Sequence, residues 1–507
     1  MTFKGGNMSI LSECLDYFVK KKEQNIAELA KKCRVDRSTM YQYIRGKRPL
    51  QNQELLETIL AELRLTPEER SKAMQAFEVT HVGEEKYYRR KKVKELFASL
   101  LTLEESGARK FIEKRDEKAS ALSVGRTKEN QIESIFCSQS EEIRMLYGEV
   151  EVQKGIHTIL RSALEEGGPV NLFLQPGTML FLYTINAIYE CASASPIRHI
   201  LCLNTNSAPM EYDTLDIVKS IMRCGVAIKE YSPYYYYGNS SEHYGMMNIL
   251  PYFIVTDDCA VQIAVDGKNA IVHRKEQIHQ YFKDSFSRML QLCYPLMKSK
   301  VGLDRRLTWG MDYASDYHYE RTIEVSSGLC SLQFWNRDLI ETYLNPSIPG
   351  YKDLLEGMVR YTALLYEVKK KDQIVILMNS RYVLEFIQTG VFREYPEIFF
   401  ISPLEKKDRK YLLEQIFQAI EEGWYHIRLL EENEFPLDYR WETVSHQNGK
   451  LYMQYCIHDQ FRIFEFEIPE VTDAVYDYLQ NLSESRTVMG EEASEQLLKR
   501  WLKEYLE

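Results

Sequence analysis

Residues 25–49, NIAELAKKCRVDRSTMYQYIRGKRP, constrain the fold more than any other stretch of this 507-residue chain. Apolar side chains recur at helical spacing in two short segments, Ile26 to Ala30 and Met40 to Ile44. Residues 33–35 separate them, and Asp36 is placed to cap the second segment, because its carboxylate can accept the unpaired N–H groups of a first helical turn. The pattern therefore predicts two short helices that meet at a tight turn and bury their apolar faces together.

The outer face of the second predicted helix is polar. Its side chains are short near the start of the helix and longer further on, which suits a helix that enters the major groove of DNA. The alternative is an ordinary helical hairpin with a solvated polar face. The candidate DNA-contacting residues on this face are Arg37, Ser38, Thr39, Tyr41, Gln42 and Arg45.

Residues 8–70 resemble the Cro/repressor-type (XRE family) helix-turn-helix of bacterial and phage regulators. The resemblance implies a five-helix domain in which residues 37–39, 41 and 42 lie at base edges, and it implies that Lys47 and Arg48 lie near phosphates. Ile44 departs from the family pattern, which often has a polar residue there. The residues that carry the resemblance are Ala27-Glu28-Leu29-Ala30, Val35, Ser38-Thr39, Tyr43 and Gly46-Lys47-Arg48-Pro49.

The charge of the chain is distributed unevenly. The whole sequence has a formal net charge of −10, but its first 50 residues contain eleven Lys and Arg against five Asp and Glu. Such asymmetry suggests that only this part of the chain meets a polyanion. A second basic run at residues 86–94, KYYRRKKVK, is either an arm that follows phosphates or the solvated face of a connecting helix.

Composition excludes several other classes of protein. No run of 18 apolar residues predicts a membrane span, and no apolar segment predicts a secretory signal at the N-terminus. The ten cysteines include no C-x-x-C pair, and the ten histidines include no pair at metal-ligand spacing. We therefore expect a cytoplasmic protein with reduced thiols, with no metal site, no cofactor and no membrane partner.

The remainder of the sequence predicts a multidomain protein. After an all-α N-terminal domain and a helical connector, strands alternate with helices, which is typical of a layered α/β region. Two stretches repeat this order, which predicts two similar α/β lobes. The first lobe should contain strands at 170–177, 197–205 and 226–231, and the second should begin with strands at 373–381 and 397–403. The predicted domains are 1–80 (helix-turn-helix), 81–165 (connector), 166–300 (lobe 1), 301–345 (connecting segment) and 346–507 (lobe 2).

The order of elements in residues 166–485 resembles the phospholipase D superfamily, in which two such lobes face each other. The catalytic motif of that superfamily is His-x-Lys-x4-Asp. Asp257 matches its last position, but Leu250 replaces the histidine and Tyr252 replaces the lysine. A leucine cannot accept a phosphoryl group, so the sequence predicts that the chain is not an enzyme and has no catalytic residue.

A tyrosine-rich stretch, SPYYYYGNSSEHYG at residues 232–245, predicts a ligand-binding loop. Tyrosines give a large contact area with a polar tip, and loops beyond strand ends commonly bind ligands in α/β sheets. An edge strand with surface-packed tyrosines is the alternative. The candidate ligand-binding residues are Tyr234, Tyr235, Tyr236, Tyr237, His243, Tyr252 and Asp257.

Together these patterns predict a sequence-specific transcriptional regulator that binds double-stranded DNA as a homodimer. Its C-terminal region would sense a small-molecule or peptide effector, or mediate assembly. Two alternatives remain open. One is a phospholipase D-like nuclease or phosphodiesterase with a DNA-binding module, and the other is a peptide-responsive regulator.

Overall fold

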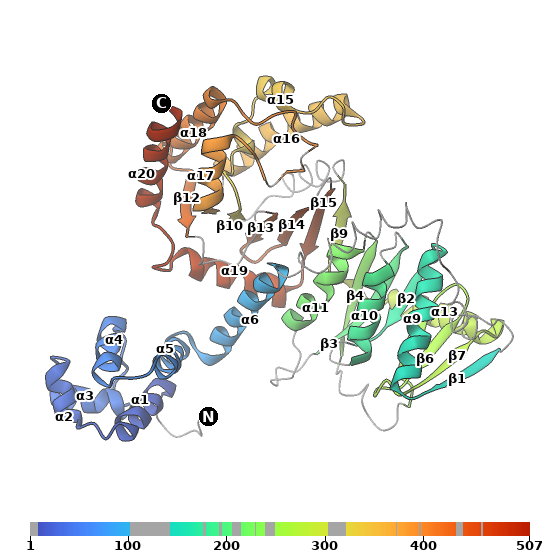
Figure 1. Ribbon diagram of the computed structural model, residues 1–507, viewed down its shortest axis with the longest axis horizontal. Helices are drawn as coiled ribbons and strands as arrows, with labels where there is room; N and C mark the ends of the chain where they lie inside the picture. The colour runs from blue at the N-terminus through green and yellow to red at the C-terminus, as the bar shows by residue number, and fades with distance from the viewer. Residues whose placement is uncertain are drawn as a thin grey trace, which may run out of the picture. The chain divides into compact units, whose positions relative to one another are not determined.

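The protein consists of two compact units, Met1–Lys92 and Val93–Glu507. The first is helical and the second is an α/β region with two mixed sheets (Figure 1), which confirms this part of the predicted fold class. The computed structural model describes residues 9–101, 142–175, 179–191, 195–204, 214–228, 230–238, 249–302, 321–371, 373–393, 395–396, 398–431, 440–457 and 460–507.

Capped helices around a small apolar core build the first unit. Four of them begin at a residue that is favoured as an N-cap, namely Ser9, Asn25, Asp36 and Asn52. Thr66 and Glu69 form a capping box at the start of the next helix. The helices are α1 (Ile10–Lys21), α2 (Ile26–Lys32), α3 (Arg37–Ile44), α4 (Gln53–Glu62) and α5 (Pro67–Val82), followed by α6 (Glu84–Leu101), which continues into the second unit.

An eight-stranded sheet with the order β1-β7-β6-β5-β2-β3-β4-β8 forms the first lobe. Helices α9, α10 and α11 share one apolar core with this sheet, and Phe286 of α13 packs in a separate cluster with Phe173 and Ile200. The strands are β1 (Ile143–Tyr147), β2 (Val170–Phe173), β3 (Ile197–Asn204), β4 (Tyr231–Gly238), β5 (Tyr252–Val255), β6 (Ala260–Ile263), β7 (Asn269–His273) and β8 (Tyr294–Pro295). The helices are α9 (Glu149–Glu165), α10 (Met179–Cys191), α11 (Thr214–Ala227) and α13 (Glu276–Leu290).

A seven-stranded sheet with the order β12-β11-β10-β13-β14-β15-β9 forms the second lobe. Its strands are β9 (Lys298–Val301), β10 (Arg321–Ser326), β11 (Gln373–Asn379), β12 (Tyr425–Leu430), β13 (Trp441–His446), β14 (Leu451–Ile457) and β15 (Gln460–Phe466). Its helices are α15 (Arg337–Tyr343), α16 (Tyr351–Lys371), α17 (Ser380–Thr389), α18 (Lys406–Glu421), α19 (Pro469–Ser483) and α20 (Glu491–Trp501), with a 3-10 turn at Leu332–Phe334 and a π-helical end at Leu502–Leu506.

The two sheets repeat one strand order. In the first lobe the order is β7-β6-β5-β2-β3-β4, and in the second it is β15-β14-β13-β10-β11-β12. In each sheet three neighbouring strands are parallel. The first of these three in the chain also pairs with an antiparallel strand, and two further strands follow that one in the sheet. This repeated topology is consistent with two similar lobes.

Several predicted elements differ from the structure. Residues 226–231 were expected to form a strand, but α11 extends to Ala227 and the strand is β4. The segment 397–403 supplies an isolated bridge at Phe400 among its described residues rather than a strand. The expected connecting segment, 301–345, contains β10, which lies in the middle of the second sheet. The expected helical connector, 81–165, contains β1, which pairs with β7.

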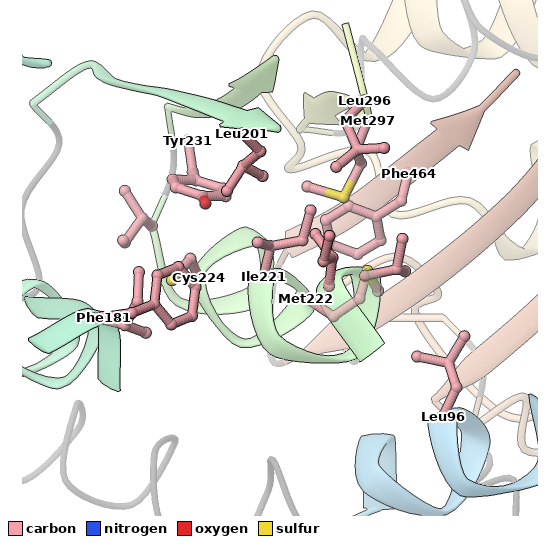
Figure 2. Packing of buried hydrophobic residues seen from close by; sticks show 14 of the residues in the cluster. Leu96, Phe181, Leu201, Ile221, Met222, Cys224, Tyr231, Leu296, Met297 and Phe464 are labelled. Atoms are coloured by element: carbon pink, nitrogen blue, oxygen red, sulfur yellow. The ribbon is translucent and has the colours of Figure 1, made fainter. Parts of the chain in front are cut away.

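One apolar core joins the two lobes. Figure 2 shows Ile221 and Met222 of α11 beside Met297 and Phe464, which lies on β15 of the second sheet. Arg462, also on β15, donates hydrogen bonds from Nη1 to the carbonyl oxygens of Gly225 and Ile228, at 2.9 and 3.0 Å. The end of α11 is therefore held by residues of the other lobe.

Candidate functional site

Helix α3 separates an apolar face from a polar one. Met40 and Ile44 are completely buried in the core of the first unit. Thr39 is half-buried, whereas the other candidate DNA-contacting residues are exposed: Arg37, Ser38, Tyr41, Gln42, Arg45, Lys47 and Arg48. The side chains that the sequence places on one outer face therefore lie together on the surface, at α3 and the turn after it.

The start of α3 is fixed by Asp36. Its Oδ2 accepts hydrogen bonds from the backbone N–H groups of Ser38 and Thr39, at 2.8 and 3.2 Å, and from the Ser38 hydroxyl at 2.5 Å. The Ser38 hydroxyl and then these backbone donors lower the pKa of the Asp36 carboxyl. The cap is thus ionised at neutral pH and holds the first turn of the helix in place.

Aromatic rings orient two of the exposed cations. The Arg37 guanidinium lies 6.0 Å from the centre of the Tyr41 ring, and that of Arg48 lies 5.8 Å from the Tyr43 ring. Arg45 lies 3.5 Å from a carboxylate oxygen of Asp16. The exposed polar side chains of α3 and the arginines beside them are therefore accessible to a negatively charged partner.

The tyrosine run does not form the expected loop. Residues 234–237 belong to β4, which pairs with β3 along its length and with β8 at two positions. Tyr234 and Tyr236 pack against the cluster that contains Phe286. The strand arises because aromatic residues favour pleated, half-buried surfaces, which outweighs the loop signal of the following Gly and Asn.

The hydroxyl of Tyr237 donates a hydrogen bond to Glu470 Oε1 at 2.9 Å, and its side chain is 46% exposed. Ligand contact by this strand stays a prediction, and Tyr237 is its most accessible tyrosine. His243 lies outside the described residues. Tyr252 is completely buried in β5, so the structure does not place it with the other ligand candidates on a surface.

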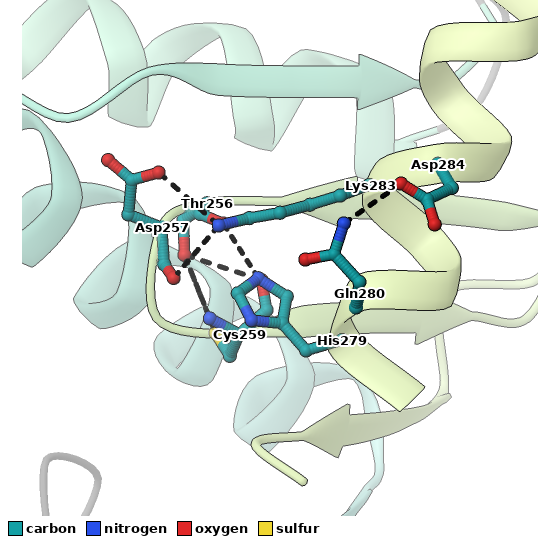
Figure 3. Close-up of polar contacts among 7 residues, drawn as sticks. All are labelled: Thr256, Asp257, Cys259, His279, Gln280, Lys283 and Asp284. Atoms are coloured by element: carbon teal, nitrogen blue, oxygen red, sulfur yellow. Dashed lines mark hydrogen bonds and ion pairs between the residues drawn. The ribbon is translucent and has the colours of Figure 1, made fainter. Parts of the chain in front are cut away.

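Asp257 lies in the turn that follows β5, where the phospholipase D-like motif would end. Its Oδ1 is 3.5 Å from Lys283 Nζ of α13, and its backbone oxygen is 3.4 Å from the same atom (Figure 3). His279 Nε2 lies 2.9 Å from the backbone oxygen of Thr256, to which it donates a hydrogen bond. The turn thus gathers a carboxylate, an ammonium and an imidazole, but the imidazole is occupied in holding the turn to α13.

A buried polar cluster in the second lobe was not predicted from the sequence. Lys369 of α16, Glu324 of β10 and Cys330 contact one another beside a cavity. They are separated by up to 45 positions in the sequence. The available signal was weak: a glutamate at the centre of the apolar strand 321–326 and a lysine within the long amphipathic helix 351–371.

No metal site and no membrane helix were found in the described part of the chain. Its histidines, cysteines and carboxylates form no group of three that could hold a metal ion. Its helices include none that is both long and apolar enough to cross a bilayer.

Comparison with known proteins gives matches among solved structures only. No family model matches the chain, and no curated protein sequence matches it. One matched structure is the crystal structure of phosphatidylserine synthase from Haemophilus influenzae Rd KW20. It has 10% sequence identity and a TM-score of 0.24, over 72% of this chain and 94% of that one. Another is the crystal structure of polyphosphate kinase from Porphyromonas gingivalis, with 8% identity and a TM-score of 0.23, over 76% of this chain and 59% of that one.

These matches correct one expectation. The sequence predicted that the chain is not an enzyme, but both matched structures are of enzymes, which contradicts that prediction. Neither match gives this chain a substrate or a catalytic residue.

Proposed function

We propose that the first unit binds double-stranded DNA, with α3 lying in the major groove. The observation that supports this most directly is the surface formed by α3 and the turn after it, where seven polar or aromatic candidate residues are exposed while Met40 and Ile44 are buried. A helix of this kind has the size and the donors and acceptors that base edges require.

Electrostatics support the same proposal. The excess of basic residues lies in the first 50 positions of an otherwise acidic chain. Cations that contact phosphates release counterions, so they contribute binding that falls as salt rises. Lys47 and Arg48 follow the end of α3, in the position from which they would contact the backbone on either side of a groove.

Two substitutions separate base contact from phosphate contact. Gln42→Ala should reduce the preference for one base pair, with a loss of about 1–3 kcal/mol at that position only. Lys47→Ala should weaken binding to all sequences and reduce the slope of log affinity against log salt by about one. Lys72→Ala is the matched control, because it removes the same charge from α5, where Lys72 pairs with Glu68.

The measurement is a gel-shift and footprinting titration of the full-length protein on DNA from its own promoter region, at two salt concentrations. A dimeric regulator should protect two half-sites about 10 base pairs apart, or a multiple of that spacing. Equal effects of Gln42→Ala and Lys47→Ala on all sequences would contradict the assigned roles. Loss of binding with Lys72→Ala as well would indicate a general charge effect.

A second candidate function is favoured by the matched enzyme structures: a phosphodiesterase of phospholipase D-like fold that carries this DNA-binding unit. It is tested by release of p-nitrophenolate from bis(p-nitrophenyl) phosphate and by cleavage of labelled DNA. Asp257→Asn, purified in parallel, should lower the rate if the turn after β5 takes part. Hydrolysis that matches the protein-free blank on both substrates would refute this candidate without affecting the DNA-binding proposal.

A further inference from the structure

The second lobe contains a cavity of about 70 Å³ on the face of its sheet that α16 covers. Strands β10, β13 and β14 form its base, because Val444 is the register partner of both Glu324 and Tyr452. Helix α16, the segment 329–335 and the side chains of Phe392, Tyr395 and Phe400 line the rest of it (the strands and α16 are labelled in Figure 1). The cavity therefore lies inside one lobe and takes no residue from the α3 surface or from the turn at Asp257.

Two of the three charged side chains of the cavity wall, Lys369 and Glu324, neutralise each other, and the third, Glu442, accepts a hydrogen bond from Gln454 Nε2 at 3.0 Å. Lys369 Nζ lies 2.7 Å from Glu324 Oε2 and 3.1 Å from Cys330 Sγ, and the Cys330 thiol is 3.0 Å from Glu324 Oε1. Burial lowers the pKa of Lys369, but Cys330 and Glu324 together raise it above its usual value, while burial raises the pKa of the Cys330 thiol. The lysine is charged and the thiol is protonated at neutral pH, so this cluster has no net charge to offer an ion.

Two hydrogen-bond donors on the same wall have no acceptor. Among the described residues, the Ser331 hydroxyl and the Trp335 indole Nε1 are buried atoms without a hydrogen-bond partner. Both side chains line the cavity, and they are 2% and 4% exposed. Buried donors of this kind are rarely left unpaired in folded proteins, so an acceptor from outside the chain is expected beside them.

Aromatic rings form another part of the wall. Trp335 lies 5.6 Å from Phe392 and 5.5 Å from Phe400, and those two rings lie 5.7 Å apart, measured between ring centres. Tyr361, Tyr395 and Tyr452 add further aromatic surface. Polar groups set among apolar and aromatic side chains are the usual composition of a small-molecule site.

We propose that this cavity binds a small uncharged molecule with a carbonyl or hydroxyl oxygen. The oxygen accepts hydrogen bonds from Trp335 and Ser331, and the apolar part of the molecule packs against Phe392 and Phe400. A cavity of about 150 Å³ holds benzene, so the volume of about 70 Å³ here suits a molecule of about three or four non-hydrogen atoms. The site gives the chain a place for a small-molecule effector that is separate from the tyrosine strand.

Three probe molecules of equal size test the proposed chemistry. Acetone is neutral with an oxygen acceptor, acetate is an anion, and isopropylammonium is a cation. Saturation-transfer NMR of each with the full-length protein measures binding in the millimolar range. Acetone should bind, and acetate and isopropylammonium should bind much more weakly, because the Glu324–Lys369 pair is already neutral.

Substitutions locate the binding and complete the test. Trp335→Phe removes one donor and should weaken acetone binding about fivefold, and Ser331→Ala should act in the same direction. Trp441→Phe is the control, because its buried Nε1 also has no partner among the described residues but its side chain lies outside the cavity. Circular dichroism of each variant distinguishes a loss of binding from a loss of folding. If Trp335→Phe does not fold, Ser331→Ala still tests the proposal.

The proposal is overturned if acetone does not bind, which would mean that water alone occupies the cavity. It is equally overturned if either ion binds as well as acetone, or if Trp441→Phe weakens binding as much as the two cavity substitutions do. None of these measurements involves DNA or phosphodiester cleavage, so the result is independent of the functions proposed above.

Discussion

His199 makes the first lobe sensitive to mild acid. It lies on β3 and is completely buried, with Nε2 2.9 Å from the backbone oxygen of Leu174 and Nδ1 2.8 Å from the Tyr231 hydroxyl. A neutral imidazole satisfies both contacts, because Nε2–H donates to the carbonyl and Nδ1 accepts from the tyrosine. Burial lowers the pKa of His199 to about 4, with a smaller opposing effect from the Leu174 carbonyl.

The sign of the pH dependence follows from this shift. The unfolded chain has the ordinary histidine pKa of 6.5, so it binds a proton before the folded protein does as the pH falls. The contribution of His199 is fully present above pH 6.5 and is lost progressively toward pH 4. Between pH 7 and pH 5 the loss amounts to about 2 kcal/mol of the free energy of unfolding.

The measurement compares the wild type with His199→Gln by urea unfolding at pH 7 and pH 5, followed by circular dichroism of the α/β region. A glutamine amide can donate to Leu174 and accept from Tyr231, but it does not titrate. The variant should therefore lose about 2 kcal/mol less than the wild type over this range. Equal losses in both proteins would refute the reasoning that the buried ring is neutral and resists protonation.

Backbone conformation and the contact between the lobes give further predictions. Gly390 and Gly423 both have positive φ, but a Cβ at Gly390 would collide with the backbone of Leu404, whereas one at Gly423 would meet nothing within 4 Å. Gly423→Ala should cost about 1–2 kcal/mol of stability through φ alone, and Gly390→Ala should cost clearly more; equal values in thermal unfolding would contradict the steric argument. Arg462→Met should destabilise the α/β region by about 1–3 kcal/mol, because it removes the donors to two carbonyls at the end of α11. Urea unfolding checks this, and an unchanged midpoint would show that those carbonyls find other donors.

The helices of the first unit could be predicted from sequence because their signals are local. Asp36 caps α3 within three residues of its own position, and the apolar spacing of Met40 and Ile44 alone identifies the buried face. Neither feature depends on a distant part of the chain. The same locality explains why the outer face, with Gln42 and Arg45, could be predicted to be a surface from the amino-acid sequence alone.

The end of α11 could not be predicted in the same way. Gly225 is a common signal for the end of a helix, yet α11 continues to Ala227. A glycine fits here because the site is crowded: a Cβ would lie 2.8 Å from the Met297 side chain and 3.0 Å from the Phe464 side chain. Since Arg462 also supplies hydrogen bonds at this helix end, the reason for the extension lies more than 230 residues away.

The cavity of the second lobe shows where sequence patterns stop being informative. Its charged pair joins a strand and a helix, and its two donors without an acceptor among the described residues belong to a short irregular segment between them. A glutamate in an apolar strand is normally an argument against burial, because a buried carboxylate is costly unless it is paired. Folding brings Lys369 and Glu324 together beside the Trp335 indole. The indole N–H has no acceptor among the described residues, and this argument for a ligand therefore depends on the three-dimensional structure.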